Sequence, residues 1–233
     1  MPLQIDIIAR IKTDFGDKFG VPRQSGMAEN KSRIVFEPKY KNREALRGIE
    51  EYSHLWLIWE FSMLPKNRKD WSPTVRPPRL GGNKRVGVFA TRSPFRPNPL
   101  GLSCVKLLSV ENDKEYGLSL VVSGADMVDG TPIYDIKPYI PYADCIENAT
   151  EGITKQTKNY SLEVEFSDEV QKMLSQEDLN EMADILKNDP RPSYQDDSSR
   201  IYGMRYKNKR IEFSVKENCL VVHSVLKCGD SNL

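Results

Sequence analysis

The stretch His54-Leu55-Trp56-Leu57-Ile58-Trp59-Glu60-Phe61 carries apolar side chains at odd and even positions alike. Such a segment favours a central β-strand with both faces covered over an edge strand that is half exposed to water. Further short apolar or alternating segments predict strands at residues 5–11, 33–36, 84–91, 103–110, 117–123 and 132–136. About seven strands with few helices predict a mainly β fold, an N-terminal antiparallel β-barrel, because closing the sheet removes its exposed edges.

Two local signals add detail to this part of the chain. Asn42 is a favoured residue for a helix N-cap, and it predicts a short helix that carries Ala45, Leu46 and Ile49 toward the core. Asn112-Asp113 is a turn-forming pair, and it predicts a hairpin between two of the strands.

The pattern changes in the last third of the chain. Residues 142–160 are polar and irregular, which is typical of a connection between two domains. After this connection, strands are predicted at residues 162–166, 201–206, 211–215 and 220–225. The strands and the connection together indicate a second, smaller folding unit.

A helix is predicted between the first and second of these C-terminal strands. Ser175 followed three residues later by Asp178 is a capping-box signature, and Asn188-Asp189-Pro190 ends the helical pattern. We therefore predict a β-barrel domain over residues 1–150 and a small α+β domain over residues 151–233.

The composition is that of an ordinary globular protein. Its net charge of +1 creates no global attraction to nucleic acid or membranes, so any site for a polyanion must arise from local clustering. The cysteines show neither a C-x-x-C pair nor metal-ligand spacing with histidine, so we expect no metal and no disulfide framework. The chain has no signal-peptide pattern and no apolar run that could span a bilayer, which predicts a cytoplasmic protein.

Two clusters of basic residues stand out locally. Residues 66–96 hold nine basic residues against one acidic residue, and Trp71 is available there to stack on a nucleic-acid base. The second cluster comprises Tyr202, Arg205, Tyr206, Lys207, Lys209 and Arg210. Either cluster is also compatible with a solvated surface loop or an ordinary charged hairpin.

The first segment with chemical potential is Thr91-Arg92-Ser93-Pro94-Phe95-Arg96-Pro97-Asn98-Pro99-Leu100-Gly101-Leu102-Ser103. Three prolines within six residues fix φ and remove amide donors, so the strip is predicted to be rigid without a hydrogen-bond ladder. A rigid strip can hold Arg92 and Arg96 in place to bind a carboxylate or phosphate. Gly101 allows a ligand or another backbone to approach closely.

The second segment runs from Asp126 to Tyr139 and contains the turn Asp129-Gly130 followed by Thr131-Pro132. Its carboxylates and free backbone groups at a strand end are suited to hold an adenine edge or ribose hydroxyls. We expect this bend and the arginine strip to converge, with Arg92 and Asp129 sharing one cavity. The alternative is a structured hairpin in which Asp135 pairs with Lys137 at the surface.

Both segments resemble the signatures of the TsaA/TrmO-like family, most closely at residues 91–103 and 129–144. The resemblance extends to Pro22-Arg23-Gln24, Ser53-His54-Leu55-Trp56, Asp189-Pro190-Arg191-Pro192 and the Tyr202-Gly203 hairpin. It implies an S-adenosylmethionine-dependent methyltransferase, active as a homodimer in tRNA modification. The implied substrate is tRNA carrying N6-threonylcarbamoyladenosine next to the anticodon, with tRNA for threonine the usual target.

The resemblance also implies which residues contact the cofactor, with the pocket near the contact between the two subunits. These residues are Pro22, Arg23, Gln24, His54, Leu55, Arg92, Leu102, Asp126, Met127, Val128 and Asp129. The residues after Pro192 are Ser193-Tyr194-Gln195-Asp196-Asp197, where relatives often continue with a basic residue, which disfavours RNA binding by that loop.

Methyl transfer to N6 of adenine requires alignment and exclusion of water, and a base would help to remove the departing proton. Asp126, Asp129 and Asp135 are the candidates, and their spacing selects none of them. An enzyme that relies on positioning alone is the alternative. The chain has no G-x-G-x-x-G motif after a strand, so a dinucleotide-type cofactor cradle is not expected. Two other functions fit the same residues: a non-catalytic RNA-binding barrel, and a methyltransferase that acts on a small molecule or a protein.

Overall fold

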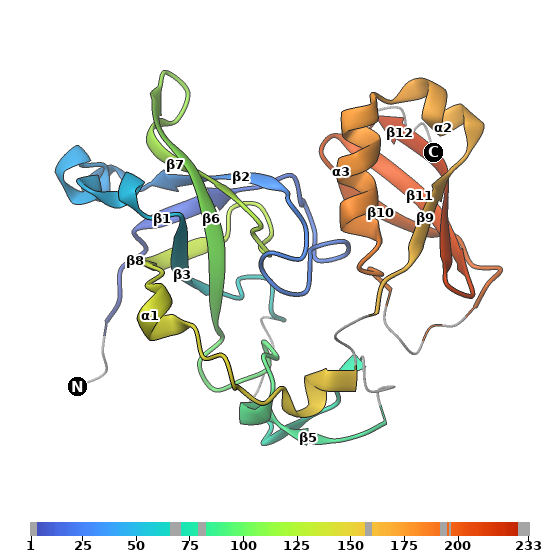
Figure 1. Cartoon of the computed structure of the whole chain (residues 1–233), viewed down its shortest axis with the longest axis horizontal. Coiled ribbons are helices and arrows are strands. Elements are labelled where there is room, and N and C mark those ends of the chain that lie inside the picture. Colours follow the sequence, from blue (N-terminus) through green and yellow to red (C-terminus); the bar gives the residue numbers. More distant parts are fainter. Residues whose placement is uncertain are drawn as a thin grey trace.

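The computed structural model describes residues 4–65, 71–78, 83–156, 160–191, 195 and 197–227. Figure 1 shows a sheet that closes on itself beside a smaller sheet covered by helices. The closed sheet consists of β1 (Ala9–Lys12), β2 (Lys31–Phe36), β3 (His54–Glu60), β6 (Leu100–Asp113), β7 (Gly117–Ser123) and β8 (Pro132–Pro138). Its order is β1-β2-β7-β6-β3-β8, every pair is antiparallel, and β8 returns to pair with β1.

The predicted closure of an antiparallel sheet is confirmed, but the described chain places six strands in it and not about seven. The segment predicted as a strand at residues 84–91 forms only β5 (Val86–Gly87), which pairs with β4 (Thr74–Val75) in a separate small hairpin. A 3-10 turn, η5 (Val88–Ala90), follows at once. Prolines and glycines on both sides of these short strands limit the pairing to two residues.

Strand β3 lies between β6 and β8, in the central position that its apolar sequence predicts. Leu55 and Leu57 are fully buried and Trp59 is nearly so, because their side chains point into the interior of the closed sheet. The alternate residues, from His54 to Glu60, are half-buried on the outer face. The inner residues join side chains from the other strands in one hydrophobic core.

Gly101 of β6 faces the indole of Trp59 across the β3–β6 pair. A Cβ atom at this position would lie 2.2 Å from Cε2 of Trp59, so a large ring fits here only because residue 101 has no side chain. The predicted close approach at Gly101 is therefore made by an aromatic side chain of the core.

Two local predictions hold with changes of detail. The side chain of Asn42 accepts from the backbone N of Glu44 and caps the 3-10 helix η2 (Arg43–Leu46); Leu46 and Ile49 pack on the core whereas Ala45 is exposed. The hairpin predicted at Asn112-Asp113 turns at residues 114–116, because β6 continues through Asp113. Short 3-10 helices flank η2: η1 (Pro38–Tyr40) and η3 (Ile49–Glu51).

The C-terminal unit is the small α+β fold that the sequence predicts. Its strands are β9 (Glu163–Phe166), β10 (Tyr202–Tyr206), β11 (Lys209–Lys216) and β12 (Cys219–Lys227), in the order β10-β11-β12-β9. The helices α2 (Asp168–Met173) and α3 (Gln176–Leu186) follow β9, which pairs parallel to β12. Ser175 accepts from the backbone N of Asp178 at 3.1 Å, so the predicted cap is confirmed.

The connection between the two sheets is mostly irregular, as expected. It contains the single-turn helix α1 (Pro141–Asp144) and the 3-10 helix η6 (Gly152–Gln156). Over the described residues, no helix combines the length and the apolar character that a membrane crossing requires.

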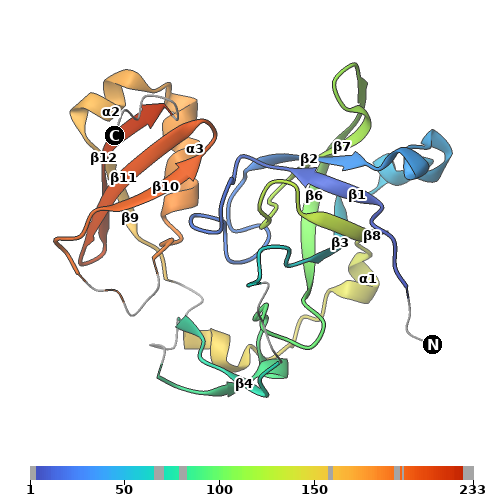
Figure 2. The same ribbon diagram turned by 180° about the vertical axis from the view of Figure 1, so that it is seen from behind.

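The loop between β1 and β2 extends from the closed sheet to the C-terminal unit (Figures 1 and 2). Phe15 in this loop is fully buried, and its ring centroid lies 5.2 Å from that of Tyr206 on β10. Ala28, Phe19 and Val21 pack in the same C-terminal core. The core of the second unit is therefore completed by residues from the N-terminal part of the chain.

Replacing Gly101 with alanine is expected to lower the free energy of unfolding by about 1–3 kcal/mol, because the Trp59 ring must move to admit a Cβ atom. Urea denaturation measures this change. Gly16→Ala is the matched control, because Gly16 is exposed and a Cβ there meets nothing within 4 Å. Equal destabilisation by the two substitutions would contradict the steric explanation.

Candidate functional site

Gln24, Arg92 and Asp126 come from three distant segments and lie together where β6 begins and β7 ends. The Arg92 guanidinium donates to Oε1 of Gln24, and its positive charge acts on the Asp126 carboxylate. Antiparallel pairing of β6 and β7 brings the residues before β6 and after β7 to the same edge of the sheet. The closed sheet thus places a cation, an amide and a carboxylate next to one another.

Asp126 is half-buried at the end of a hydrogen-bond chain that starts in the core. Trp59 Nε1 donates to Ser103 Oγ at 2.9 Å, and Ser103 Oγ donates to Asp126 Oδ1 at 2.5 Å. Burial raises the pKa of Asp126, while the Ser103 hydroxyl and the charge of Arg92 act in the opposite direction. This carboxyl group therefore binds a proton more readily than an exposed aspartate does.

The arginine strip is held by local hydrogen bonds in place of a β ladder only up to residue 99, the part that contains its prolines. From Leu100 to Ser103 the prediction of a segment without a ladder is wrong, because these residues begin β6 and pair with β3. Thr91 Oγ1 donates to the Val88 carbonyl at 2.8 Å and accepts from Ser93 N at 3.2 Å. Arg96 is half-buried and donates to the Thr91 carbonyl at 3.1 Å. Arg96 thus turns back onto its own loop, while Arg92 is exposed and faces Gln24.

The Pro22-Arg23-Gln24 segment is held from the C-terminal unit. Arg23 Nη2 donates to the carbonyls of Asp189 and Arg191, at 2.6 Å and 2.7 Å. Asp189 and Arg191 form an ion pair of 3.0 Å with only 3% and 6% of their side chains exposed. Tyr160 donates its hydroxyl to the same aspartate at 2.8 Å.

This arrangement explains the Asp189-Pro190-Arg191 motif: its buried ion pair and carbonyls hold the loop that carries Gln24. We call Arg23, Asp189 and Arg191 the clamp. The remaining residues of the motif region, Pro192, Ser193, Tyr194 and Asp196, lie outside the described residues.

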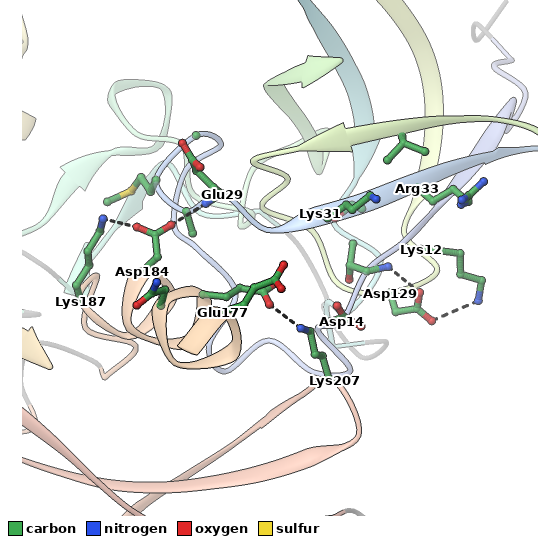
Figure 3. Close-up of a pocket in the computed structure, with 18 of the residues that line it drawn as sticks. Lys12, Asp14, Glu29, Lys31, Arg33, Asp129, Glu177, Asp184, Lys187 and Lys207 are labelled. Carbon is green, nitrogen blue, oxygen red and sulfur yellow. Dashed lines mark hydrogen bonds and ion pairs between the residues drawn. The ribbon is translucent and has the colours of Figure 1, made fainter. Parts of the chain in front are cut away.

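Asp129 lies apart from Arg92 in the structure of a single chain. It accepts from Thr13 N at 3.1 Å and from Lys12 Nζ at 3.4 Å. It lines a cleft of about 1120 Å³ between the closed sheet and α3, which Lys207 and acidic residues of α3 also line (Figure 3). Arg92 does not line this cleft, so the cleft is not the cavity that Arg92 and Asp129 were expected to share. The charge of Arg92 acts instead on the Asp126 carboxylate.

His54 belongs to a separate aromatic group on the outer face of the closed sheet. Its Nδ1 lies 2.9 Å from Ser53 Oγ, and its ring centroid lies 6.3 Å from that of Tyr139. Trp56 packs on Tyr139 and donates to Asp144 Oδ2 at 3.0 Å.

The strand register separates this group from Leu102. His54 pairs with Lys106, whereas Leu102 pairs with Ile58, four residues further along β3. At about 3.3 Å per residue, His54 and Leu102 are roughly 13 Å apart along the strand. His54 and Leu102 therefore lie at different levels along the β3–β6 pair.

The side chains of the predicted contacts also differ in how far they are exposed at the surface. Leu55 is fully buried and Met127 is 1% exposed, so both side chains belong to the core. Pro22 is buried, Val128 is half-buried, and Leu102 is 56% exposed.

Sequence reasoning missed Ser103, which connects Trp59 to Asp126. Its signal was a hydroxyl at an inward position of the strand, between Gly101 and Val105, where a polar group requires a hydrogen-bond partner. The structure also distinguishes the three candidate bases. Asp135 pairs with Lys137 at 3.0 Å on the surface, as the hairpin alternative predicts, and Asp129 is exposed and pairs with Lys12.

Both halves of the chain match models of known protein families. Residues 10–145 match the tRNA-methyltransferase O N-terminal domain, and residues 159–228 match the TrmO C-terminal domain. A tRNA (adenine(37)-N6)-methyltransferase of Escherichia coli K12 is 39% identical over 198 residues, which cover 82% of this chain and 83% of that protein. A protein of the same name from Eikenella corrodens is 40% identical over 176 residues, covering 75% of this chain and 97% of its own length.

Two matches from Pseudomonas aeruginosa, one in sequence and one in structure, extend the comparison. A putative S-adenosylmethionine-dependent methyltransferase is 37% identical over 214 residues, covering 88% of this chain and 89% of that protein. The crystal structure of TrmO superposes with a TM-score of 0.74 and 31% identity, covering 97% of this chain and 99% of the other. Sequence and structure agree over nearly the whole length, and the chain therefore belongs to the TrmO family of tRNA (adenine(37)-N6)-methyltransferases.

Proposed function

We propose that this protein transfers the methyl group of S-adenosylmethionine to N6 of N6-threonylcarbamoyladenosine, next to the anticodon of threonine tRNA, in the cytoplasm. The relatives named tRNA (adenine(37)-N6)-methyltransferase support the reaction class. The observation that carries the proposal is the convergence of Gln24, Arg92 and Asp126 at the edge of the closed sheet.

The chemistry of these residues fits the cofactor. S-adenosylmethionine carries a carboxylate, an ammonium and ribose hydroxyls, and the site offers the guanidinium of Arg92, the amide of Gln24 and the carboxylate of Asp126 as partners. We propose as binding residues Pro22, Arg23, Gln24, His54, Leu55, Arg92, Leu102, Asp126, Met127, Val128 and Asp129. Leu55 and Met127 can contribute only main-chain groups, because their side chains are in the core.

Asp126 is the carboxylate that best suits removal of the N6 proton. S-adenosylmethionine supplies an electrophilic methyl group, and the protein has to orient the acceptor, exclude water and take up one proton. Burial raises the pKa of Asp126 toward the working pH of a general base, whereas Asp129 and Asp135 are exposed and paired with lysines. In this proposal the N6 nitrogen gains the methyl group and its proton passes to Asp126.

We also propose the two-domain division at residues 1–150 and 151–233, and a homodimer with the cofactor pocket near the subunit contact. The exposed side chains of Leu100, Leu102 and Leu108 on β6 support a covered outer face. A second copy there would bring another subunit's residues to the Arg92 site. Sedimentation velocity tests this point, and a monomer at working concentration would exclude it.

Loss of the protein from cells is expected to abolish methylated threonylcarbamoyladenosine in tRNA while the unmethylated nucleoside accumulates. Mass spectrometry of tRNA nucleosides from a deletion strain measures both. Calorimetric titration with S-adenosylmethionine then separates this function from a non-catalytic RNA-binding role. An unchanged nucleoside profile together with cofactor binding would indicate a methyltransferase with another substrate.

Asp126→Asn is expected to lower kcat by roughly a hundredfold or more and to remove the rise of kcat with pH. Because the folded pKa of Asp126 lies above the unfolded value, its contribution to stability is present below the unfolded pKa and is lost as pH rises through the folded pKa. The asparagine should therefore not reduce stability at neutral pH. Steady-state rates and urea denaturation measure both effects, over roughly pH 4–8, the range in which an aspartate with a raised pKa changes its protonation.

The matched control is Asp135→Asn, because the Asp135 side chain is 45% exposed and pairs with Lys137 at the surface. It should keep the wild-type pH profile. If Asp126→Asn retains the pH-dependent rise, Asp126 is not the base.

Arg191→Gln is expected to weaken S-adenosylmethionine binding about tenfold, because the carbonyls that hold Arg23 lose their fixed position. Arg191 acts here as a positioning residue, since it touches the loop and not the ligand. Calorimetry on the folded fraction measures the dissociation constant, and Arg191→Lys should recover part of the affinity. A lower melting temperature with an unchanged dissociation constant for S-adenosylmethionine would show that the clamp stabilises the fold and does not position the binding site.

A further inference from the structure

An exposed aromatic pair lies on the small β4–β5 hairpin. Phe89 is 72% exposed and Trp71 is 41% exposed, with their ring centroids 6.0 Å apart and their planes 31° from parallel. The hairpin lies at the lower edge of Figures 1 and 2, away from the strands of the C-terminal sheet. Large aromatic rings with this degree of exposure are candidates for contact with a partner.

The pair is held by ordered backbone. Val88 follows β5 and directly precedes Phe89. It is 1% exposed, and its backbone N donates to the Pro73 carbonyl at 2.9 Å. Arg85 Nη1 donates to Thr74 Oγ1 at 2.9 Å across the hairpin. Because Val88 anchors the turn that presents Phe89, a ligand would meet a surface that is already formed, at little cost in ordering entropy.

The segment that carries the pair is rich in basic residues. Residues 71–96 contain six basic residues and no acidic residue. Arg76, Lys84, Arg85 and Arg92 are exposed, and none of them forms an ion pair with another described residue. The charge of this surface is therefore available to a polyanion.

The second basic cluster differs in this respect. Lys207 pairs with Asp178 and Glu181, at 3.3 Å and 2.5 Å. Lys209 pairs with the same aspartate at 3.5 Å, and Arg210 pairs with Glu212 at 3.2 Å. These cations are neutralised within the protein, which favours the β4–β5 hairpin over the C-terminal hairpin as the surface that meets phosphates.

The chain geometry also places the pair close to the methyl-donor site. Phe89 precedes Arg92 by three residues, so their Cα atoms are at most about 11 Å apart. That is the scale of one or two nucleotides in a single strand. A base that stacks on Phe89 would therefore belong to a nucleotide near the acceptor adenosine.

We propose that Trp71 and Phe89 stack on an unpaired base of the anticodon loop near the acceptor, while Arg76, Lys84 and Arg85 bind the neighbouring phosphates. The inference rests on the tRNA methyltransferase activity proposed above and names the surface that binds the RNA. Unpaired loop bases are what proteins recognise by aromatic stacking, and lysine and arginine supply the phosphate contacts.

The aromatic contact is tested with Phe89→Leu and Trp71→Leu, which keep much of the apolar area and remove the ring face. Fluorescence anisotropy with a labelled anticodon stem-loop should show a dissociation constant raised about five- to a hundredfold for each leucine variant. Phe89→Trp retains a ring and should bind like the wild type. The dissociation constant for S-adenosylmethionine should be the same in all of them.

The charge contact is tested with the combined substitutions Arg76→Gln, Lys84→Gln and Arg85→Gln. Each phosphate contact contributes about −0.7 to the slope of log affinity against log salt for a single strand. Removing about three contacts should therefore make this slope shallower by about 2. The control combines Lys209→Gln and Arg210→Gln on the C-terminal hairpin, whose charges are paired with Asp178 and Glu212. It should leave both affinity and slope unchanged.

Several outcomes would overturn the inference. Leucine at position 89 with wild-type RNA affinity excludes stacking, and a changed sedimentation coefficient in the same variant would assign Phe89 to a contact between protein chains. An equal loss of slope in the C-terminal control would show that the hairpin charges are not special. In each case wild-type methylation of tRNA would leave the proposed function intact, whereas a wild-type protein that neither binds nor methylates tRNA would refute the function itself.

Discussion

Arg23 joins the two halves of the molecule through the main-chain carbonyls of Asp189 and Arg191. A buried ion pair is stable only when its remaining hydrogen-bonding groups are satisfied. Here Asp189 also accepts from the Tyr160 hydroxyl and from Arg191 N, so its charge is fully paired. On its other side the same loop is fixed to the closed sheet, where Gly26 N donates to the Gly124 carbonyl at 2.9 Å. The position of Gln24 depends on both attachments.

Because its carbonyls hold Arg23, the C-terminal unit has a structural role in positioning the loop of the closed-sheet domain. Lys207, Lys209 and Arg210 of its β10–β11 hairpin are paired with acidic side chains of α3 and β11. Its core takes up Phe15 and Ala28 from the β1–β2 loop. The unit thus stabilises the loop that carries Gln24 toward Arg92. Among the described residues that precede Arg92, Arg76, Lys84 and Arg85 form no ion pair with another described residue. The surface proposed for RNA and the site proposed for the methyl donor therefore adjoin along one stretch of chain.

Patterns of local origin were predictable from the sequence, and pairings over long distances were less so. The cap at Ser175, the C-terminal strands and the central position of β3 follow from spacing and apolar periodicity. Residues 84–91 have the composition of a strand, yet only Val86–Gly87 finds a partner, and sequence periodicity does not report whether a partner exists. The resemblance to the family selected Arg92 and all the residues from Asp126 to Asp129, without separating the two aspartates. In the structure Asp126 is half-buried and accepts from Ser103, whereas Asp129 is exposed and pairs with Lys12.

The segment that decides the fold also shapes the site. Trp59 of β3 fills the core only because Gly101 leaves room for its ring, and in that position its indole nitrogen reaches Ser103. Ser103 has two lone pairs and one proton; it accepts from Trp59 and can therefore direct its proton to Asp126. The orientation of a half-buried carboxylate at the edge of the sheet is thus set by packing in its interior. The hydrogen bond from Ser103 therefore holds the Asp126 carboxylate without a charged partner in the core. Because Arg92 is not needed in the core for this purpose, its side chain remains exposed at the edge of the sheet.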